Sequence, residues 1–519
     1  MSAEANAATW FVDRHPREGR ADKTAFREAG GGRSLTYGAL ADGAGRVAGA
    51  MGRAGHRREE RAAMIVLDTV EFPQVFWGCI KAGIVPIPLN TLLSADIYNV
   101  ILRDCRASCL FVSEPLLDTV RPALEGNPYL RHVVVIGAAT PEVPGCGAGC
   151  ESWDAFMAGA EPAETVEADE DEVAFWLYSS GSTGQPKGVR HVHASLRCTA
   201  ETYGAQVLGI REEDTLYSVA KMFFAYGLGN AMTFPMSVGA TTVLFPGRPT
   251  PEAAVEIIAD ESPTIFCGVP TLYAATVAHL EARGGAPAHA LRSCISAGEA
   301  LPEEVGKRWK GLFGVDILDG VGSTEMLHIF LSNRPGDVVY GTSGTAVPGY
   351  DVRLVDEEGN EVGPGGLGEL LVRGNSAAEG YWNKRHKTRN TFEGEWTRTG
   401  DKYEMTASGR LVYCGRTDDM FKVSGIWVSP FEVEQALIAH PGVLEAAVVA
   451  ARDESGLEKP MAFIVPKAGQ DGEALATELK EFVKSRIGKW KYPRWIKVVD
   501  DLPKTATGKI QRFKLREVA

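Results

Sequence analysis

Short apolar segments of strand length recur along the first half of the chain, and stretches of helix length separate them. Residues 37–54 place Leu40, Ala44, Val47 and Met51 at helical spacing, and strand-like and helix-like segments then alternate. A strand, a helix and a second strand form the repeating unit of a parallel sheet. The sequence therefore predicts layered α/β subdomains. The expected strands are Ala63–Leu67, Ile84–Leu89, Cys109–Val112, His132–Ile136, Val173–Leu177, Thr242–Phe245 and Thr264–Cys267.

The length and two changes of pattern predict the domains. At 519 residues the chain exceeds the range over which one hydrophobic core keeps growing, so at least two domains are expected. After Tyr350 the pattern alternates like an antiparallel hairpin region, and after Arg416 it changes again. We predict a large N-terminal domain (1–417), with α/β sheets and a β-rich subdomain, and a small α+β C-terminal domain (418–519). In the latter we expect helices at Glu432–Ala439 and Ala476–Ile487 and strands at Ala446–Ala450 and Met461–Val465.

Charge and cysteine content narrow the classes of protein. A formal net charge of −13 argues against an extended nucleic-acid surface, which needs clustered cations. Residues 1–20 lack the apolar core of a signal peptide, and no run of about 18 apolar residues follows. The nine cysteines stand among apolar neighbours and suit buried thiols in a reducing compartment. We expect a cytoplasmic enzyme with small-molecule substrates that binds neither nucleic acid nor membrane.

Two pairs of cysteines have the wrong spacing for a zinc knuckle. Three residues separate Cys105 from Cys109, and three separate Cys146 from Cys150, where a CxxC knuckle has two. No histidine pair accompanies them in the sequence. The spacing therefore argues against a metal site at these cysteines.

The strongest local signal is a segment rich in glycine and hydroxyl side chains, Tyr178–Val189. Its glycines let backbone N–H groups turn toward an anion, its hydroxyls can donate to phosphate oxygens, and Lys187 adds positive charge. A P-loop NTPase needs Ser or Thr after the lysine, but Gly188 stands there. We predict a pyrophosphate cradle; a Ser/Gly linker is the alternative for the segment alone. The expected ligands are Ser179, Ser180, Gly181, Ser182, Thr183, Gly184 and Lys187.

Four further motifs follow the phosphate loop in order. They are Gly320-Val-Gly-Ser-Thr-Glu325, Thr399-Gly-Asp401, Gly415-Arg-Thr-Asp-Asp419 with Lys422-Val-Ser-Gly425, and Pro503-Lys-Thr-Ala-Thr-Gly-Lys509. Together the five motifs resemble the adenylate-forming superfamily of acyl-CoA ligases, luciferases and peptide-synthetase adenylation domains, over nearly the whole chain. The resemblance implies ATP, Mg²⁺ and coenzyme A, two half-reactions at one site, and a mobile C-terminal domain.

The resemblance also assigns roles to residues around the nucleotide. Two anions must meet in adenylation, and one like-charge pair at roughly 4 Å costs about 4 kcal/mol at an effective dielectric constant near 20. The expected catalytic residues are Glu325, which holds Mg²⁺, Thr324, which contacts the α-phosphate, and Lys509, which neutralises charge between the carboxylate and the α-phosphate. The resemblance places Ser296–Ala300 along one face of the adenine, and it makes Asp401 the acceptor of both ribose hydroxyls, with Arg416 beside it. The other expected nucleotide and CoA ligands are therefore Ala297, Gly298, Glu299, Asp319, Gly320, Asp401, Arg416 and Gly425.

Several of these residues have a structural alternative. Glu325 can be a helix-start acid, Lys509 a surface lysine, Asp401 a turn aspartate and Arg416 a surface arginine. Val321 stands where many relatives have an aromatic residue, so adenine stacking is expected to be weaker or supplied differently.

In the second half-reaction the CoA thiol, acting as thiolate, displaces AMP. The resemblance makes Asp418 the hinge and places Gly425 in a narrow pantetheine tunnel. No motif identifies a general base. His193 is expected near the site, whereas His191 belongs either there or at a capped helix start. The basic stretch from Lys484 to Lys497 either attracts CoA phosphates or, as we favour, is a solvated helix face.

Two segments, Lys221–Asn230 and Glu325–Phe330, are more similar to benzoate-CoA ligases than to fatty-acid ligases. In such enzymes they line the acyl pocket, and large side chains there leave a short slot for a flat ring. Core packing is the alternative for Phe224 and Ile329. The candidates are Phe224, Ala225, Tyr226, His328 and Ile329, with Ala297 and Gly322 closing the slot.

We therefore predict an AMP-forming acid:CoA ligase that makes benzoyl-CoA from benzoate through benzoyl-AMP, in aromatic compound degradation. The alternatives are a stand-alone aryl-acid adenylating enzyme that acylates a carrier protein, a ligase for hydroxy- or aminobenzoate, and an inactive nucleotide-binding scaffold. No carrier domain follows Ala519, and the motif residues Lys509, Glu325 and Asp401 argue against the scaffold. The sequence leaves the oligomeric state open, a homodimer included.

Overall fold

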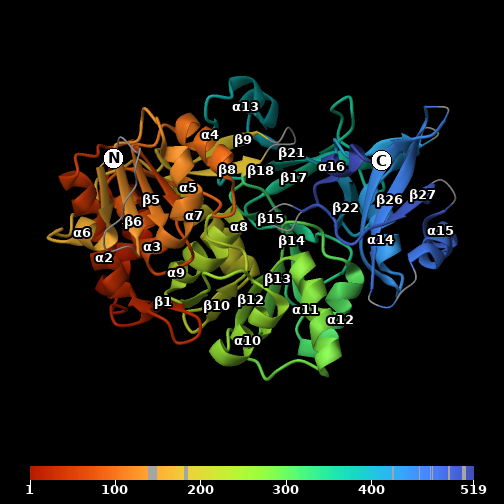
Figure 1. Ribbon diagram of the computed structural model, residues 1–519, viewed down its shortest axis with the longest axis horizontal. Coiled ribbons are helices and arrows are strands. Elements are labelled where there is room, and N and C mark those ends of the chain that lie inside the picture. Colours follow the sequence, from red (N-terminus) through yellow and green to blue (C-terminus); the bar gives the residue numbers. More distant parts are fainter. Residues whose placement is uncertain are drawn as a thin grey trace.

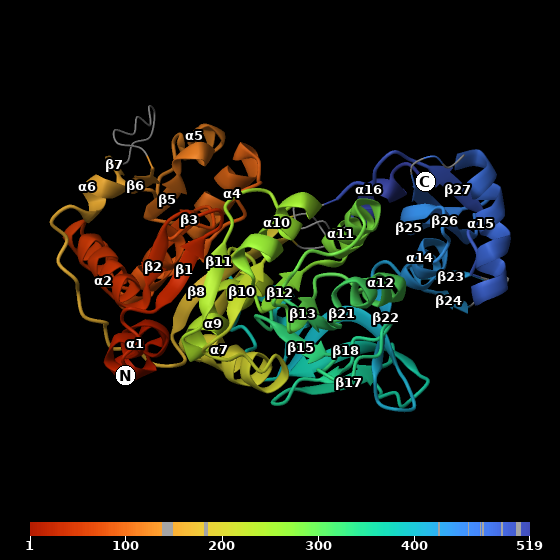
Figure 2. The ribbon, with the colours of Figure 1, turned by 90° about the horizontal axis from the view of Figure 1, so that it is seen from below.

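The structure of the chain is a computed structural model of all 519 residues. It describes the chain except residues 138–148, 181–184, 424–425, 455, 468, 470–471, 489–490 and 505–509, and except the side chains of residues 180, 426 and 473. A large body of layered sheets and helices carries a smaller domain at one end, and the two termini lie at opposite ends of the molecule (Figures 1 and 2). The predicted fold class is confirmed.

The first subdomain is a five-stranded parallel sheet with the order β4-β3-β5-β6-β7. Helix α2 begins after Thr36, whose side chain accepts a hydrogen bond from the backbone of Ala39 and caps the helix. The strands predicted in this region are confirmed. The elements are β3 (Arg61–Ile65), β4 (Val85–Pro88), β5 (Cys109–Ser113), β6 (His132–Ile136), β7 (Gly149–Ser152), α1 (Arg14–Arg17), α2 (Tyr37–Arg53), α3 (Glu71–Lys81), α4 (Ala95–Cys105), α5 (Leu117–Leu124) and α6 (Trp153–Met157).

A nine-stranded sheet, in the order β16-β15-β14-β13-β12-β10-β11-β1-β2, forms the centre of the large body. Strands β10 to β14 are parallel, and β15 and β16 continue the sheet as antiparallel strands. Helices lie along it, as Figure 2 shows for α10 and α11. The strands are β1 (Thr24–Glu28), β2 (Ser34–Thr36), β10 (Thr215–Ser218), β11 (Thr241–Leu244), β12 (Ile265–Gly268), β13 (Ser293–Ser296), β14 (Ile317–Gly322), β15 (Ile329–Ser332) and β16 (Thr345–Ala346). The helices are α7 (His193–Thr199), α8 (Ala225–Leu228), α9 (Phe234–Val238), α10 (Pro251–Glu261), α11 (Pro270–Arg283), α12 (Glu303–Phe313) and the π-helices η4 (Ala200–Val207) and η5 (Gly229–Thr233).

Two smaller sheets complete the large body. Strands β8 (Val173–Ser180) and β9 (Pro186–Val192) form an antiparallel hairpin with β19 (Gly380–Tyr381) at its edge. The antiparallel region predicted after Tyr350 is confirmed as a second, five-stranded sheet. It contains β17 (Asp351–Val355), β18 (Leu367–Arg373), β20 (Phe392–Glu393), β21 (Trp396–Met405) and β22 (Leu411–Arg416), with α13 (Arg385–Thr391) beside it.

The C-terminal domain has a hydrophobic core of its own, which runs from Phe421 to Val483. Strands β25, β26 and β27 form one sheet, and β23 and β24 a short hairpin. The elements are β23 (Phe421–Val423), β24 (Ile426–Val428), β25 (Val443–Arg452), β26 (Glu458–Pro466), β27 (Trp495–Val498), α14 (Pro430–Ile438), α15 (Gly472–Ile487) and α16 (Arg512–Arg516). Within the described part of the chain, every helix is too short or too polar to cross a membrane.

Candidate active site

The predicted phosphate loop lies at the tip of the β8–β9 hairpin. Ser180 pairs with Pro186 at the end of the ladder, and residues 181–184 of the loop lie outside the described part. Ser179 stands opposite Lys187 on the neighbouring strand. The Oγ atom of Ser179 is buried and has no hydrogen-bond partner in the described part of the structure. An orphaned buried hydroxyl beside a lysine fits the binding of an anionic group.

Lys187 forms a compact polar cluster with Glu325 and Tyr381. Its Nζ atom donates to Glu325 Oε1 at 2.7 Å and to the hydroxyl of Tyr381 at 2.9 Å. The Tyr381 hydroxyl donates to the same carboxylate oxygen at 2.8 Å. Burial alone would raise the pKa of Glu325, but the charge of Lys187 and the two hydrogen bonds bring this pKa below its ordinary value. The carboxylate is therefore ionised at neutral pH.

An ionised carboxylate fits the predicted magnesium ligand. Mg²⁺ takes oxygen ligands and is usually bound through one or two carboxylates together with substrate phosphates. Both contacts described above go to Oε1 of Glu325, and Oε2 takes part in neither. When bound, Mg²⁺ neutralises charge on the phosphate oxygens.

His191 lies against the second motif, and His193 does not. The Nε2 atom of His191 lies 2.8 Å from the carbonyl oxygen of Thr324, and burial lowers the pKa of this imidazole to about 4. The ring is therefore neutral and donates its Nε2–H to the carbonyl. His193 instead accepts a hydrogen bond from the backbone N–H of Ala7 at 3.1 Å, where α7 begins. The expectation that His193 is the histidine beside the site was wrong, since His191 fills that place.

The predicted adenine segment follows the end of β13. Ala297 is buried, and Gly298 has a φ of 100°, a left-handed conformation that favours glycine. On the adjacent strand β14, burial raises the pKa of Asp319 to about 8, so that this carboxyl group is protonated at neutral pH. A Cβ atom on Gly320 would lie 2.9 Å from Cγ2 of Ile329, so this position has no room for a side chain.

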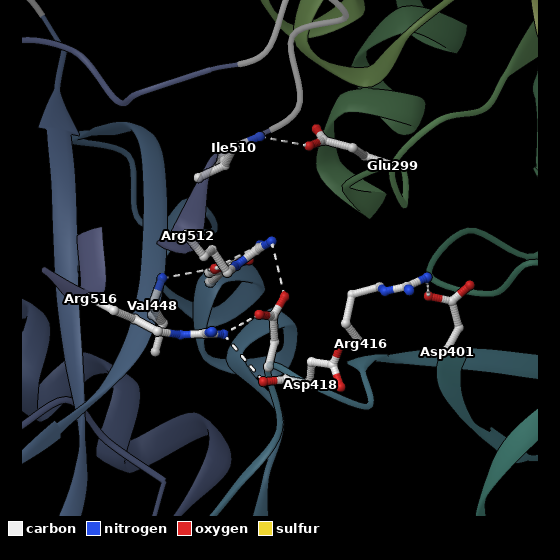
Figure 3. A network of polar contacts seen from close by, with 10 residues as sticks. Glu299, Asp401, Arg416, Asp418, Val448, Ile510, Arg512 and Arg516 are labelled. Atoms are coloured by element: carbon white, nitrogen blue, oxygen red, sulfur yellow. Dashed lines mark hydrogen bonds and ion pairs between the residues drawn. The ribbon is translucent and has the colours of Figure 1, made fainter. Parts of the chain in front are cut away.

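Asp401 and Arg416 form the predicted pair for the ribose. They lie opposite each other on the antiparallel strands β21 and β22. The guanidinium Nη1 of Arg416 donates to Asp401 Oδ1 at 3.0 Å (Figure 3). Asp401 is thus a strand residue rather than a turn aspartate, and Arg416 is ion-paired rather than a lone surface arginine. A carboxylate held by its cation in this way is suited to accept hydrogen bonds from a vicinal diol.

The two acyl segments meet through Tyr226 and His328. The Tyr226 hydroxyl donates to the carbonyl oxygens of Gly268 at 3.1 Å and Ile295 at 3.2 Å, at the ends of β12 and β13. His328 Nε2 lies 3.3 Å from the carbonyl of Tyr226, and burial lowers the pKa of this imidazole to about 3. The histidine is neutral and donates to that carbonyl.

The other acyl candidates lie on different elements, and further aromatic rings pack around His328. Rings of Tyr203, Tyr226 and Phe234 lie around His328, with ring centroids 4.5 to 5.6 Å apart. A Cβ atom on Gly322 would lie 2.5 Å from the carbonyl oxygen of His328. Ile329 is buried in β15. Phe224 and Ala225 stand at the start of α8, where the Phe224 ring packs against Phe223 at an interplanar angle of 58°, with centroids 4.3 Å apart.

The C-terminal domain reaches this region beside its last motif. The backbone N–H of Ile510 donates to Glu299 Oε1 at 3.1 Å (Figure 3). Lys509 and Gly425 lie outside the described residues. The basic stretch makes contacts within its own domain: Lys491 Nζ binds both carboxylate oxygens of Glu432, at 2.8 and 2.6 Å.

Two residues near the phosphate side were not found by sequence reasoning. Tyr381, in the two-residue strand β19, bridges Lys187 and Glu325 as described above. Lys387, in α13, lies close enough to Lys187 for its pKa to be lowered by burial and by that neighbouring charge. Neither residue belongs to a motif, and only the fold brings them to the hairpin.

The motifs and their geometry define a nucleotide-dependent acid-activating enzyme. Residues 12–382 match the family described as AMP-binding enzyme, and residues 432–509 match the AMP-binding enzyme C-terminal domain. The chain belongs to this family, the adenylate-forming superfamily.

The chain is similar along nearly its whole length to ligases of aromatic acids. It is 52% identical over 516 residues to the 4-hydroxybenzoate--CoA/benzoate--CoA ligase of Rhodopseudomonas palustris, with 99% of this chain and 94% of that protein covered. It is 53% identical over 515 residues to the benzoate--CoA ligase of Thauera aromatica, with 98% and 95% covered. The solved structure of a benzoate CoA ligase from Burkholderia xenovorans LB400 superposes with a TM-score of 0.90 at 47% identity, covering 98% of this chain and 99% of that one.

Proposed function

We propose that this enzyme is an ATP-dependent ligase that forms benzoyl-CoA from benzoate, ATP and CoA through a benzoyl-AMP intermediate. The observation that carries the proposal is that one short segment, from Thr324 to Ile329, serves both halves of the site. Its glutamate joins Lys187 and Tyr381 on the phosphate side, and its histidine lies among aromatic rings on the acyl side. The carboxyl group of a flat aromatic acid in the slot would point toward the phosphates. The whole-length similarity to benzoate ligases supports benzoate as the acid.

In the first half-reaction an oxygen of benzoate attacks the α-phosphorus of ATP. A C–O–P anhydride bond forms, the bond between the α-phosphorus and the bridging oxygen breaks, and pyrophosphate leaves. We propose that Ser179 and Lys187 bind the phosphate oxygens, with Ser180 and residues 181–184 of the loop, and that Thr324 contacts the α-phosphate. Glu325 would hold Mg²⁺, and Lys509 would place positive charge between the reacting anions.

In the second half-reaction the sulfur of CoA attacks the carbonyl carbon of benzoyl-AMP. A C–S bond forms, the bond between that carbon and the phosphate oxygen breaks, and AMP leaves with the electron pair, while the thiol proton passes to solvent. We propose that the C-terminal domain rotates between the two steps and brings Gly425 to the pantetheine. Domain motions of this kind often limit the rate of turnover.

We further propose that the domain boundary lies between Thr417 and Asp418, as the sequence predicted. The backbone N–H of Thr417 donates to the carbonyl of Gly400, in β21 of the large body, at 2.9 Å. Arg516, in α16 of the small domain, donates to the carbonyl of Asp418 at 3.3 Å (Figure 3). Successive residues are therefore bound to different domains, which supports a pivot at this point of the chain.

We keep the cytoplasm as the predicted location, and a homodimer as the state to test. The free, mostly buried cysteines, among them Cys79, Cys267 and Cys294, support a reducing compartment. Size-exclusion chromatography with light scattering would measure the oligomeric state directly.

The decisive experiment supplies the purified enzyme with ATP, Mg²⁺, free CoA and single carboxylic acids, and measures AMP and acyl-CoA together. We expect steady turnover, equal amounts of the two products, and the highest kcat/KM with benzoate among benzoate, 4-hydroxybenzoate, 2-aminobenzoate, octanoate and acetate. A preference for octanoate or acetate would contradict the acyl assignment. Acyl-AMP formation without turnover of free CoA would favour transfer to a carrier protein.

A further inference from the structure

Three side chains of types that commonly bind metals meet at one edge of the first parallel sheet, outside the site assigned to acyl-CoA formation. They are His56, in the connection from α2 to β3, Cys109, the first residue of β5, and His132, the first residue of β6. One donor atom of each lies within 4.8 Å of the others. Cys109 and His132 are paired residues on neighbouring parallel strands, so the register of the sheet places them side by side. The cysteine spacing in the sequence relates Cys109 only to Cys105, so it gives no sign of the two histidines, which the fold brings close to Cys109.

Each histidine is oriented by a carboxylate on its outer nitrogen. His56 Nδ1 lies 3.2 Å from Glu60 Oε2, and His132 Nε2 lies 2.7 Å from Glu151 Oε1. A carboxylate at these contacts accepts, so the proton of each neutral ring sits on its outer nitrogen. The inner nitrogens, His56 Nε2 and His132 Nδ1, then both present lone pairs, and they lie 3.2 Å apart. Two acceptors at this distance need a cation or a further proton between them.

The third donor decides in favour of a metal. A shared proton would use the two imidazoles and leave the thiol of Cys109 without a role, although its sulfur lies within 4.8 Å of a ring nitrogen of each histidine. Two nitrogens bound at about 2.0–2.1 Å to one tetrahedral zinc ion are roughly 3.3 Å apart, close to the separation found here. Carboxylates on the outer nitrogens of ligating histidines are the usual second layer of zinc sites.

Charge and burial fit the same ion. His56 and Cys109 are buried, and the His132 side chain is only 12% exposed. Arg131 forms an ion pair with Glu60 at 2.5 Å. The two positive charges of the ion and the one on Arg131 would balance the Cys109 thiolate and the carboxylates of Glu60 and Glu151. A set of two imidazoles and one thiolate suits Zn²⁺ rather than Mg²⁺ or Ca²⁺, which take oxygen ligands.

We propose that His56, Cys109 and His132 bind one Zn²⁺ ion, with a water molecule as the fourth ligand. The ion ties the connection before β3 to the starts of β5 and β6, and so stabilises the first subdomain. None of the residues assigned to the formation of the acyl-CoA contributes to this metal site. The site is therefore independent of the proposed function.

Cobalt binding tests the proposal on the full-length enzyme. After dialysis against a chelator, Co²⁺ is titrated into the protein. We expect saturation at one ion per chain, with the visible bands of tetrahedral Co²⁺ and a near-ultraviolet band from the thiolate, both removed by Zn²⁺. Zn²⁺ should also raise the Tm of the chelated protein. Absence of a stoichiometric cobalt spectrum in the parent protein would overturn the proposal, whatever the behaviour of the variants.

Matched variants assign the ligands. Cys109→Ser should lose the thiolate band and the effect of Zn²⁺ on Tm while still forming benzoyl-CoA. His132→Gln should weaken cobalt binding at least tenfold. Cys105→Ser is the control, because Cys105 is a buried thiol in α4, outside the three-residue cluster, whose sulfur donates to the carbonyl of Leu102 at 3.6 Å. An identical thiolate band in Cys109→Ser and Cys105→Ser would refute the assignment.

Discussion

Ile510 donates its backbone N–H to the carboxylate of Glu299 at 3.1 Å, which joins the C-terminal domain to the segment after β13 (Figure 3). Ile510 is the next residue in the chain after Lys509, the predicted catalytic lysine, and Glu299 belongs to the predicted adenine segment. The contact therefore joins the residue that follows the last motif to a segment predicted to bind the nucleotide. We propose that this arrangement of the two domains serves the first half-reaction.

We expect Glu299→Ala to slow benzoyl-AMP formation about tenfold, because a hydrogen bond to a charged group contributes about 1.5–3 kcal/mol. Transfer of supplied benzoyl-AMP to CoA should be nearly unchanged, since the contact belongs to the first arrangement. Pyrophosphate exchange and single-turnover thioester formation measure the two steps. Lys509→Ala should show the same selectivity with a deeper loss. Glu303→Ala is the control, because Glu303 is a surface carboxylate paired only with Lys307 among the ion pairs described, at 2.7 Å. Equal losses in both steps would contradict the docking role.

The Lys187–Glu325 pair makes a prediction about pH. In the parent enzyme the pKa of Glu325 is lowered, so the pair stabilises the fold above the ordinary carboxylate pKa and this contribution is lost as pH falls through the lowered value. In Lys187→Met burial acts on the carboxylate without its cation, and the pKa of Glu325 rises. Breaking a nearly buried pair should cost about 3–5 kcal/mol at pH 8.

The sign of the pH effect separates this account from a general loss of packing. Lys187→Met should lose less stability at pH 5 than at pH 8, because the carboxyl group becomes neutral there. Urea unfolding at the two pH values measures the difference. Arg197→Met is a suitable control, since Arg197 is exposed and pairs with Glu201 on the surface at 2.7 Å. A loss of the same size at both pH values would contradict the predicted shift.

Asp418→Pro should separate the two half-reactions. Proline at position 418 would fix φ near −65°, and so prevent rotation about the N–Cα bond at the proposed pivot. We expect pyrophosphate exchange to stay within about threefold of the parent and thioester formation to fall by at least 100-fold. Asp418→Ala, which shortens the side chain and leaves φ free, should retain both steps. If Asp418→Pro transferred benzoyl to CoA at the parent rate, rotation about this residue would not be needed.

Much of the fold was predictable because its strands are apolar and its helices amphipathic. The strands at His132–Ile136 and Cys109–Ser113 were found almost at their observed ends, since both are continuous apolar runs. Strands β10 and β13 were not predicted. They begin and end in threonine or serine, as Thr215–Ser218 and Ser293–Ser296, so neither gives a clear apolar run.

The site was predictable where a motif carries it and unpredictable where only the fold brings residues together. Asp401 and Arg416 were named from two motifs, and the register of β21 and β22 places them side by side. Tyr381 and Lys387 carry no motif. His193 was preferred to His191, but β9 ends at Val192, so only His191 lies in the strand that meets Thr324, whereas His193 begins α7.

The acyl slot yields the last prediction, which concerns Ile329 and Tyr226. Ile329 is 1% exposed, and its side chain fills the space that a Cβ atom on Gly320 would occupy. Ile329→Ala should therefore open room beneath the ring of the substrate. We expect the ratio of kcat/KM for 4-methylbenzoate to that for benzoate to rise about tenfold, since one carbon in an apolar pocket is worth about 1–3 kcal/mol. Stability should fall by about 2–4 kcal/mol because the site is buried.

Tyr226→Phe is the matched control, because it keeps the ring and removes only the hydroxyl. The carbonyls of Gly268 and Ile295 then lose a donor, at a cost of about 1–3 kcal/mol in stability, while the shape of the slot is preserved. Both variants therefore lose stability, but only Ile329→Ala should change the ranking of acids. The two kcat/KM values and the urea midpoint of each variant measure these effects. If Ile329→Ala lost stability without changing the ranking of the acids, Ile329 would be a packing residue, and other side chains would limit the depth of the slot.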